Sequence, residues 1–232
     1  MSCSADPGPL DDRQPGPGLR ADAERNRDRI LAAARRLFAG QGLGVSMACV
    51  AREAGVGKAT LSRRFASREE LINAVFADRM DACAAATAQA LADPDPWRGF
   101  TGFIETVCAM QAADRGFADV LARSFPAAKA VEARRAEAYE GFLAIIARAQ
   151  ESGHLRADFT ADDLVILLMA NAGVVAATAG AAPDTWRRLV GQMLRAYAAP
   201  GAPLPPLAPL APPPSQTALY RAMVRLARHN PG

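Results

Sequence analysis

Apolar residues recur at intervals of three and four through most of this chain of 232 residues, from Arg25 to about Ala199. This spacing places them on one face of an α-helix, and no run alternates apolar and polar positions as a half-buried strand does. Alanine, leucine and arginine, which favour helix, dominate the same region. The pattern predicts an all-α fold.

Helix start and stop signals divide the first part of this region. Apolar positions from Ile30 to Phe38 share one face of a first helix, which Gly40 and Gly42 are expected to stop. Ser46 is placed to cap a second helix, and Gly55 to end it. A third helix of barely two turns is predicted over residues 58–65. Helix, glycine-containing turn and short helix together make a helix-turn-helix arrangement, whose last helix can enter a DNA major groove.

The rest of the chain divides by the same signals. Ser67 and Glu70 form a capping box that opens a fourth helix, which runs to about Leu91. Further helices are expected near residues 97–110, 115–124, 127–152, 160–179 and 185–199.

Proline and glycine mark both ends. Residues 1–24, with four Pro and three Gly, predict a disordered N-terminal arm. Residues 200–232 form a proline-rich tail that finishes in a short basic amphipathic segment. Between them we expect a helix-turn-helix DNA-binding domain over 25–70 and a second helical domain over 71–199.

Charge is concentrated in the same place as the helix-turn-helix. Residues 25–68 carry nine Arg and one Lys against two acids, whereas the net charge of the whole chain is only +3. A basic block in an otherwise slightly acidic chain is typical of a surface that meets a polyanion. The alternative is a solvated basic helix face with no partner.

The third helix carries the candidate chemistry. At ~100° per residue, turning Leu61 and Phe65 inward leaves Ala59, Thr60 and Arg63 on the far side, flanked by Ser62 and Arg64. Arginine can pair with a guanine edge or a phosphate, threonine can bond a base or a phosphate, and alanine can touch a thymine methyl. Lys58 and Arg64 suit phosphate oxygens.

A family resemblance follows from these residues. The pattern Ile30-Leu31-x-Ala33-Ala34-x-x-Leu37-Phe38, Gly42, Ala54-Gly55-Val56-Gly57, Thr60-Leu61 and Phe65-x-Ser67 resembles the DNA-binding domain of TetR-family transcriptional regulators. The resemblance implies a homodimer, a three-helix reading head and a helical C-terminal domain that binds a small effector and pairs the subunits.

Three positions of the head are singled out by comparison with the family pattern. Ser62 stands where the family usually has Tyr, and it is too short to reach a phosphate in the same way. Arg68 stands where the family usually has Lys, and it keeps the charge at the start of the fourth helix. Ser46 stands where a Thr often bonds the DNA backbone, although a simple helix cap is the alternative. The predicted DNA-binding set is Ser46, Lys58, Ala59, Thr60, Ser62, Arg63, Arg64 and Arg68.

The second domain resembles the family more loosely. Its last two helices are expected to form the homodimer interface, through residues of about 160–199. Apolar side chains of the middle helices could line a cavity for a largely apolar effector, or could be plain core. The set is Trp97, Phe100, Phe103, Ile104, Met110, Phe117, Phe125, Tyr139 and Phe142.

We therefore expect a ligand-responsive regulator, by default a repressor, that binds an inverted-repeat DNA operator. The alternatives are a regulator of this fold without an effector and an all-helical enzyme. Against an enzyme, only two histidines occur, and no nucleophile motif or phosphate loop is present. No cofactor, metal site or membrane segment is expected, and the absence of a signal peptide predicts a cytoplasmic protein.

Overall fold

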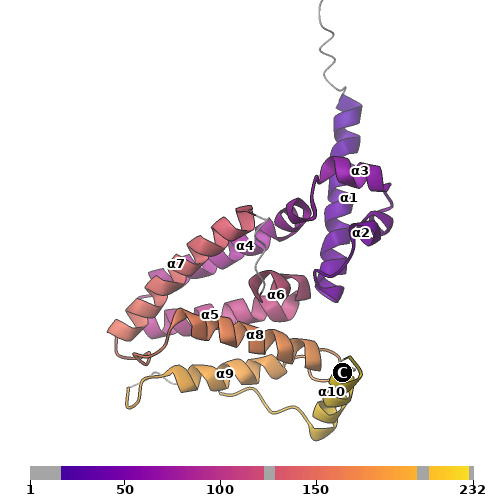
Figure 1. Cartoon of the computed structure of the whole chain (residues 1–232). Coiled ribbons are helices and arrows are strands. Elements are labelled where there is room, and N and C mark those ends of the chain that lie inside the picture. The colour runs from indigo at the N-terminus through magenta and orange to yellow at the C-terminus, as the bar shows by residue number, and fades with distance from the viewer. Residues whose placement is uncertain (1–16, 123–128, 203–208, 230–232) are drawn as a thin grey trace, which may run out of the picture.

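The computed structural model describes residues 17–122, 129–202 and 209–229. This part of the chain is all-α, as predicted, and has one isolated antiparallel bridge between Leu155 and Ala198. Its helices are α1 (Pro17–Gln41), α2 (Met47–Ala54), α3 (Lys58–Arg64), α4 (Arg68–Ala92), α5 (Pro96–Ala113), α6 (Arg115–Ala122), α7 (Lys129–Glu151), α8 (Ala161–Thr178), α9 (Thr185–Tyr197) and α10 (Gln216–His229) (Figure 1).

Helix α1 begins earlier than the composition indicated. Residues 17–24 were expected in the disordered arm, but they form about two turns of helix. Proline is favourable at a first helical position because its φ is already fixed and its missing amide has no helical partner. The next residues include good helix formers, so local propensity outweighs the Pro and Gly content. The early part of α1 projects beyond α3 (Figure 1).

The head consists of α1, α2 and α3, and the expected signals shape it. Gly42 adopts φ +73° and its amide donates to the carbonyl of Phe38, which closes α1. Ser46 Oγ accepts from the Cys49 amide at 3.2 Å and caps α2. Gly55 ends α2 at φ +63°, a left-handed conformation that glycine adopts without strain.

Helix α4 leads from the head into the body, where it packs against α5 and α7 (Figure 1). Ser67 Oγ accepts from the Glu70 amide at 3.1 Å, which is half of the expected capping box. The carboxylate of Glu70 accepts from the Ala66 amide at 2.7 Å, one residue before the position that a capping box uses.

Helix α6 joins the body to the head. The carboxylate of Asp119 accepts from the Leu43 amide at 2.8 Å, directly after α1. The rings of Phe38, Phe76 and Phe117 lie in series across α1, α4 and α6, with successive centroids 6.1 Å apart. Gly116 is required at this contact because a Cβ would lie 2.8 Å from Phe38 and from Phe76. The position of the head is therefore set by packing on α6 as well as by α4.

The described part of the tail is attached to the body. The Arg188 guanidinium of α9 donates to the carbonyl of Ala211 at 2.7 Å. Leu210 lies 3.0 Å from the place that a Cβ on Gly191 would occupy. Helix α10 then packs against α8 (Figure 1).

Candidate nucleic-acid interface

Helix α3 has one buried and one exposed side. Leu61 and Phe65 are 2% and 1% exposed, as expected for its two core anchors. Thr60 is half-buried. The remaining predicted contact residues of this helix are all exposed: Lys58, Ala59, Ser62, Arg63 and Arg64.

Contacts from α1 hold both ends of the α3 region. The Arg29 guanidinium donates to the carbonyl of Gly55 at 3.1 Å, in the turn before α3. The Arg27 guanidinium lies 5.0 Å from the ring centroid of Phe65, at the end of α3, in a cation–π contact. Sequence reasoning did not identify these two arginines as positioning residues. Their only signal was membership of the basic block.

The arginines of the basic block differ in how their charges are balanced. Arg35 and Arg36 form ion pairs with Asp78 and Glu53, each at 3.1 Å. By contrast, the basic side chains of α3 form no ion pair with any carboxylate in the described residues. Arg63 Nε donates only to the carbonyl of Ala59, at 3.3 Å. Positive charge is therefore left on the outward side of α3.

Two predicted residues have structural roles beside α3. Arg68 Nη1 donates to the carbonyl of Val45 at 2.7 Å and so ties the start of α4 to the turn before α2. Ser46, the next residue in that turn, is exposed and caps α2. Its hydroxyl hydrogen is still a donor that a phosphate oxygen can accept.

A short helix held by the two preceding helices, with an exposed cationic side, defines a helix-turn-helix DNA-binding protein. Residues 30–75 match the family model described as bacterial regulatory proteins, tetR family. Residues 95–195 match the model for the C-terminal domain of SbtR-like transcriptional regulators. The two matches cover more than half of the chain, which belongs to the TetR family of transcriptional regulators.

The chain is also similar to proteins of solved structure. A TetR regulatory protein from Mycobacterium vanbaalenii is 31% identical, with 78% of this chain and 99% of that chain covered and a TM-score of 0.42. NalD, the secondary repressor of the MexAB-OprM multidrug efflux pump in Pseudomonas aeruginosa, is 20% identical, with coverages of 78% and 98% and a TM-score of 0.55. A gamma-butyrolactone receptor described as ArpA-like is 16% identical, with coverages of 90% and 100% and a TM-score of 0.55.

The predicted effector-binding residues lie in more than one place. Four of them are buried, and their rings stack one on the next at centroid distances of 5.3–6.4 Å, in the order Trp97, Phe100, Phe142 and Phe103. Ile104 is also fully buried, and Met110 is half-buried with its sulfur 3.7 Å from that of Cys83.

The other three members of that set lie apart from the ring cluster. Phe117 packs at the joint with the head, 6.1 Å from Phe76. Tyr139 is 48% exposed on α7, and Phe125 lies outside the described residues. Sequence reasoning missed Phe159, whose ring meets those of Phe100 and Tyr197 edge-on at 5.3 and 4.7 Å.

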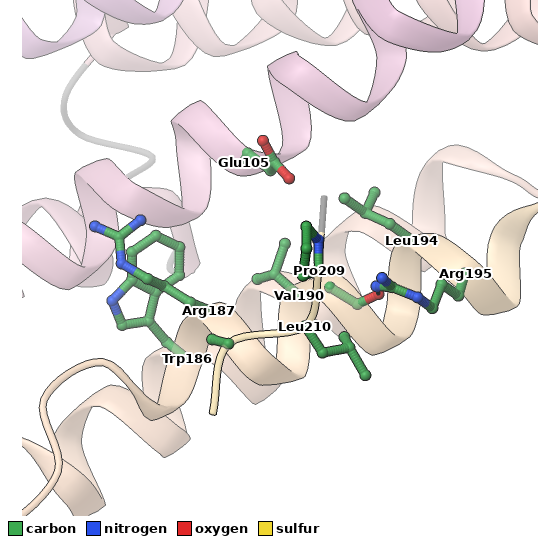
Figure 2. A pocket seen from close by; sticks show the side chains of 10 residues that line it. Glu105, Trp186, Arg187, Val190, Leu194, Arg195, Pro209 and Leu210 are labelled. Carbon is green, nitrogen blue, oxygen red and sulfur yellow. Dashed lines mark hydrogen bonds between the residues drawn. The ribbon is translucent and has the colours of Figure 1, made fainter. Parts of the chain in front are cut away.

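Most hollows of the described body involve other residues. One of about 290 Å³ lies between α5, α9 and residues 209–211, and Figure 2 shows Glu105 facing Val190 and Pro209 across it. In it the Arg187 guanidinium lies 4.5 Å from the Trp186 ring centroid. A second, of about 400 Å³, lies between α4 and α7. A third, of about 640 Å³, lies between the loop before α8 and the end of α9, and none of the predicted effector-binding residues lines these three. Phe103 lines a smaller hollow of about 220 Å³ between α4 and α5.

Several polar groups of the body are buried, and burial affects their protonation and hydrogen bonding. Burial raises the pKa of the Cys83 thiol to about 11 and that of Cys108 to about 12, so both stay protonated near neutral pH. The Asn171 amide, fully buried on α8, donates to Gln111 Oε1 at 2.9 Å. Among the described residues, no group of three His, Cys, Asp or Glu side chains could hold a metal ion.

Proposed function

We propose that this protein is a homodimeric repressor that inserts α3 of each subunit into the major groove of an inverted-repeat operator. The observation that carries the proposal is the outward side of α3, where Lys58, Arg63 and Arg64 lack carboxylate partners in the described residues, while Arg35 and Arg36 of α1 have them. A charge left unpaired beside paired ones is available to phosphates and base edges. DNA as the ligand also supports a cytoplasmic location.

The predicted contact residues fall into three groups by role. Arg63 reads a guanine edge, with Ala59 and Thr60 touching neighbouring bases. Lys58 and Arg64 meet phosphates, and Ser46, Ser62 and Arg68 lie at the edge of the same surface. The head ends near residue 70, within the first turn of α4, and the regulatory domain follows.

The homodimer is supported by the outward side of α8. Val165, Ile166 and Met169 are 42%, 63% and 54% exposed, and Ala170 and Gly173 continue the same side toward the end of α8. We call these five residues the α8 face. Helix α8 is also long and apolar enough to cross a membrane, with a mean hydropathy of 1.5. Burial of one side in the core and of the α8 face against a second subunit accounts for that composition.

A binding assay tests the DNA proposal. In fluorescence anisotropy with DNA from upstream of its own gene, we expect saturable binding that unlabelled specific DNA displaces far better than random DNA. Two subunits should require half-sites one helical turn, ~34 Å, or a multiple of it apart. Arg63→Ala should weaken binding by ~1–3 kcal/mol and relax the preference at one base position. Arg156→Ala, on the loop before α8, is the matched control.

Indifference to competitor sequence would refute the operator proposal. Equal losses from Arg63→Ala and from Arg156→Ala would refute the role of α3.

An effector is supported by the apolar aromatic interior of the body. We propose that a small, largely apolar molecule binds among Trp97, Phe100, Phe103, Ile104 and Phe142, and that its binding releases DNA. Phe117, at the joint with the head, and Tyr139, exposed on α7, lie apart from this place and are not proposed to contact the same molecule. The gamma-butyrolactone receptor is a neighbour of the same fold that is named for a small ligand.

The alternative is a regulator without an effector. A panel of lipophilic compounds separates the two, because a molecule that binds the folded protein raises its melting temperature by linkage. A compound that raises the melting temperature and also lowers DNA affinity supports the effector. Compounds that raise the melting temperature without changing DNA affinity favour the alternative.

A further inference from the structure

Exposed large apolar side chains are concentrated on two helices that contact each other. In the described part of the chain, nine such residues are exposed, and all but Tyr139 and Leu143 of α7 lie on α8 or α10. On α10 they are Leu219, Tyr220, Met223 and Leu226, between 40% and 67% exposed. We call these four residues the α10 face. Scattered exposed apolar residues are ordinary, whereas a cluster marks an interaction surface.

The α10 face is not the side by which α10 is attached to its own subunit. Ala222 is the buried position of the helix, at 4% exposure, and α10 packs on α8. Arg225 approaches the end of α8, where a Cβ on Gly180 would lie 2.4 Å from its guanidinium. At ~100° per residue the α10 face lies to one side of Ala222, and Arg221 and Arg225 lie to the other.

Helix α10 is held in place before any partner arrives. Its linker is fixed on α9 by the hydrogen bond from Arg188 to the carbonyl of Ala211 and by Leu210 against Gly191. The match to the family's C-terminal model ends at residue 195, so α10 is an addition to that domain. A helix of 14 residues is marginal alone, and attachment to α8 positions its apolar side at low entropic cost.

We propose that α10 is a second dimerisation element, and that the α10 face packs against the partner copy beside the α8 face. The inference rests on the proposed homodimer. A second copy is the occupant that the structure favours because α10 contacts α8, with Arg225 beside Gly180 after the end of α8, so a subunit that packs along α8 from the α8 face toward that end would meet α10. The partner's identical surface is also apolar, as a self-complementary twofold interface requires.

Sedimentation equilibrium of the full chain measures the dimer dissociation constant directly. Met223→Glu places a charge in the proposed contact and should raise that constant by about tenfold or more. Arg221→Glu, on the other side of α10, is the matched control and should leave it close to wild type. Ile166→Glu should raise it through the α8 face alone. Circular dichroism checks that each variant stays helical.

The outcomes separate the two proposals. A wild-type chain that remains a monomer at micromolar concentration contradicts the homodimer itself. A wild-type dimer whose constant is unchanged by Met223→Glu overturns the α10 proposal and leaves the homodimer standing, with the α10 face assigned to a different partner. If Met223→Glu loses helix, hydrogen exchange of the wild type decides, because residues 219–226 should exchange more slowly above the dimer dissociation constant than below it. Equal exchange on both sides also overturns the α10 proposal.

Discussion

The contact between Asp119 and the Leu43 amide offers a direct test of how the body holds the head. Its donor belongs to a buried residue, since Leu43 is only 4% exposed, and the N···O distance is 2.8 Å. Asp119→Ala removes the acceptor and leaves that amide without its partner. Hydrogen bonds to charged groups contribute ~1.5–3 kcal/mol, and an unsatisfied buried donor loses ~1–3 kcal/mol. These two ranges describe the same lost hydrogen bond and are not added, so we expect the free energy of unfolding to fall by ~2 kcal/mol.

Equilibrium unfolding in urea gives this value, and hydrogen exchange of the Leu43 amide localises it. Asp119→Asn keeps one acceptor oxygen and should lose only ~1 kcal/mol. Asp158→Ala is the control, because its carboxylate is exposed and pairs only with the nearby Arg156, and the urea midpoint should stay at the wild-type value. An Asp119→Ala midpoint equal to that of the control would refute the reasoning, as would unchanged exchange at Leu43.

Three further predictions follow from the same structure. Phe65→Ala, at a 1% exposed anchor, should destabilise the head by ~3–5 kcal/mol and abolish binding to all DNA sequences, with proteolysis between α2 and α4 as the measurement. If Arg68 meets a phosphate as well as the Val45 carbonyl, Arg68→Ala should weaken all sequences alike and flatten the salt dependence of binding, whereas a change in base preference would contradict a phosphate contact. Cys83 and Cys108 should resist a thiol reagent at pH 8 until the protein unfolds, because only the thiolate reacts and burial raises their pKa values to about 11 and about 12; labelling faster than unfolding would exclude this.

The sequence predicted most of the helices because their signals are local. A hydroxyl at Ser46 and a left-handed glycine at Gly55 act within a few residues of their own positions, and both work as expected. The error at the start of α1 has a local cause as well. The composition of residues 1–24 was averaged over the whole segment, whereas Pro17 starts a helix from its own position.

The outward side of α3 was predictable because a helix of two turns with two apolar residues has only one way to lie on a core. The contacts that orient it were not. Arg29, which holds the turn before α3, is 26 residues from Gly55, and Arg68, which holds the start of α4, is 23 residues from Val45, so no short window of sequence indicates either pairing. The sequence alone does not distinguish an arginine of the basic block that contacts a DNA phosphate from one that donates to a backbone carbonyl of its own chain.

The aromatic residues of the body show why an effector site is harder to predict than a DNA-binding helix. Helical spacing marks Phe100 and Phe142 as buried, but a side chain that lines a cavity and one that fills a core have the same spacing. In the structure these two rings are in contact, and Phe159 meets both edge-on. A molecule that entered here would have to separate α5 from α7. Since α5 also packs on α4 and α6, and α6 contacts the head through Asp119, such a separation would reach the head through packed helices. The close packing of the rings is therefore compatible with regulation, provided that the effector binds a more open body than the one in this structure.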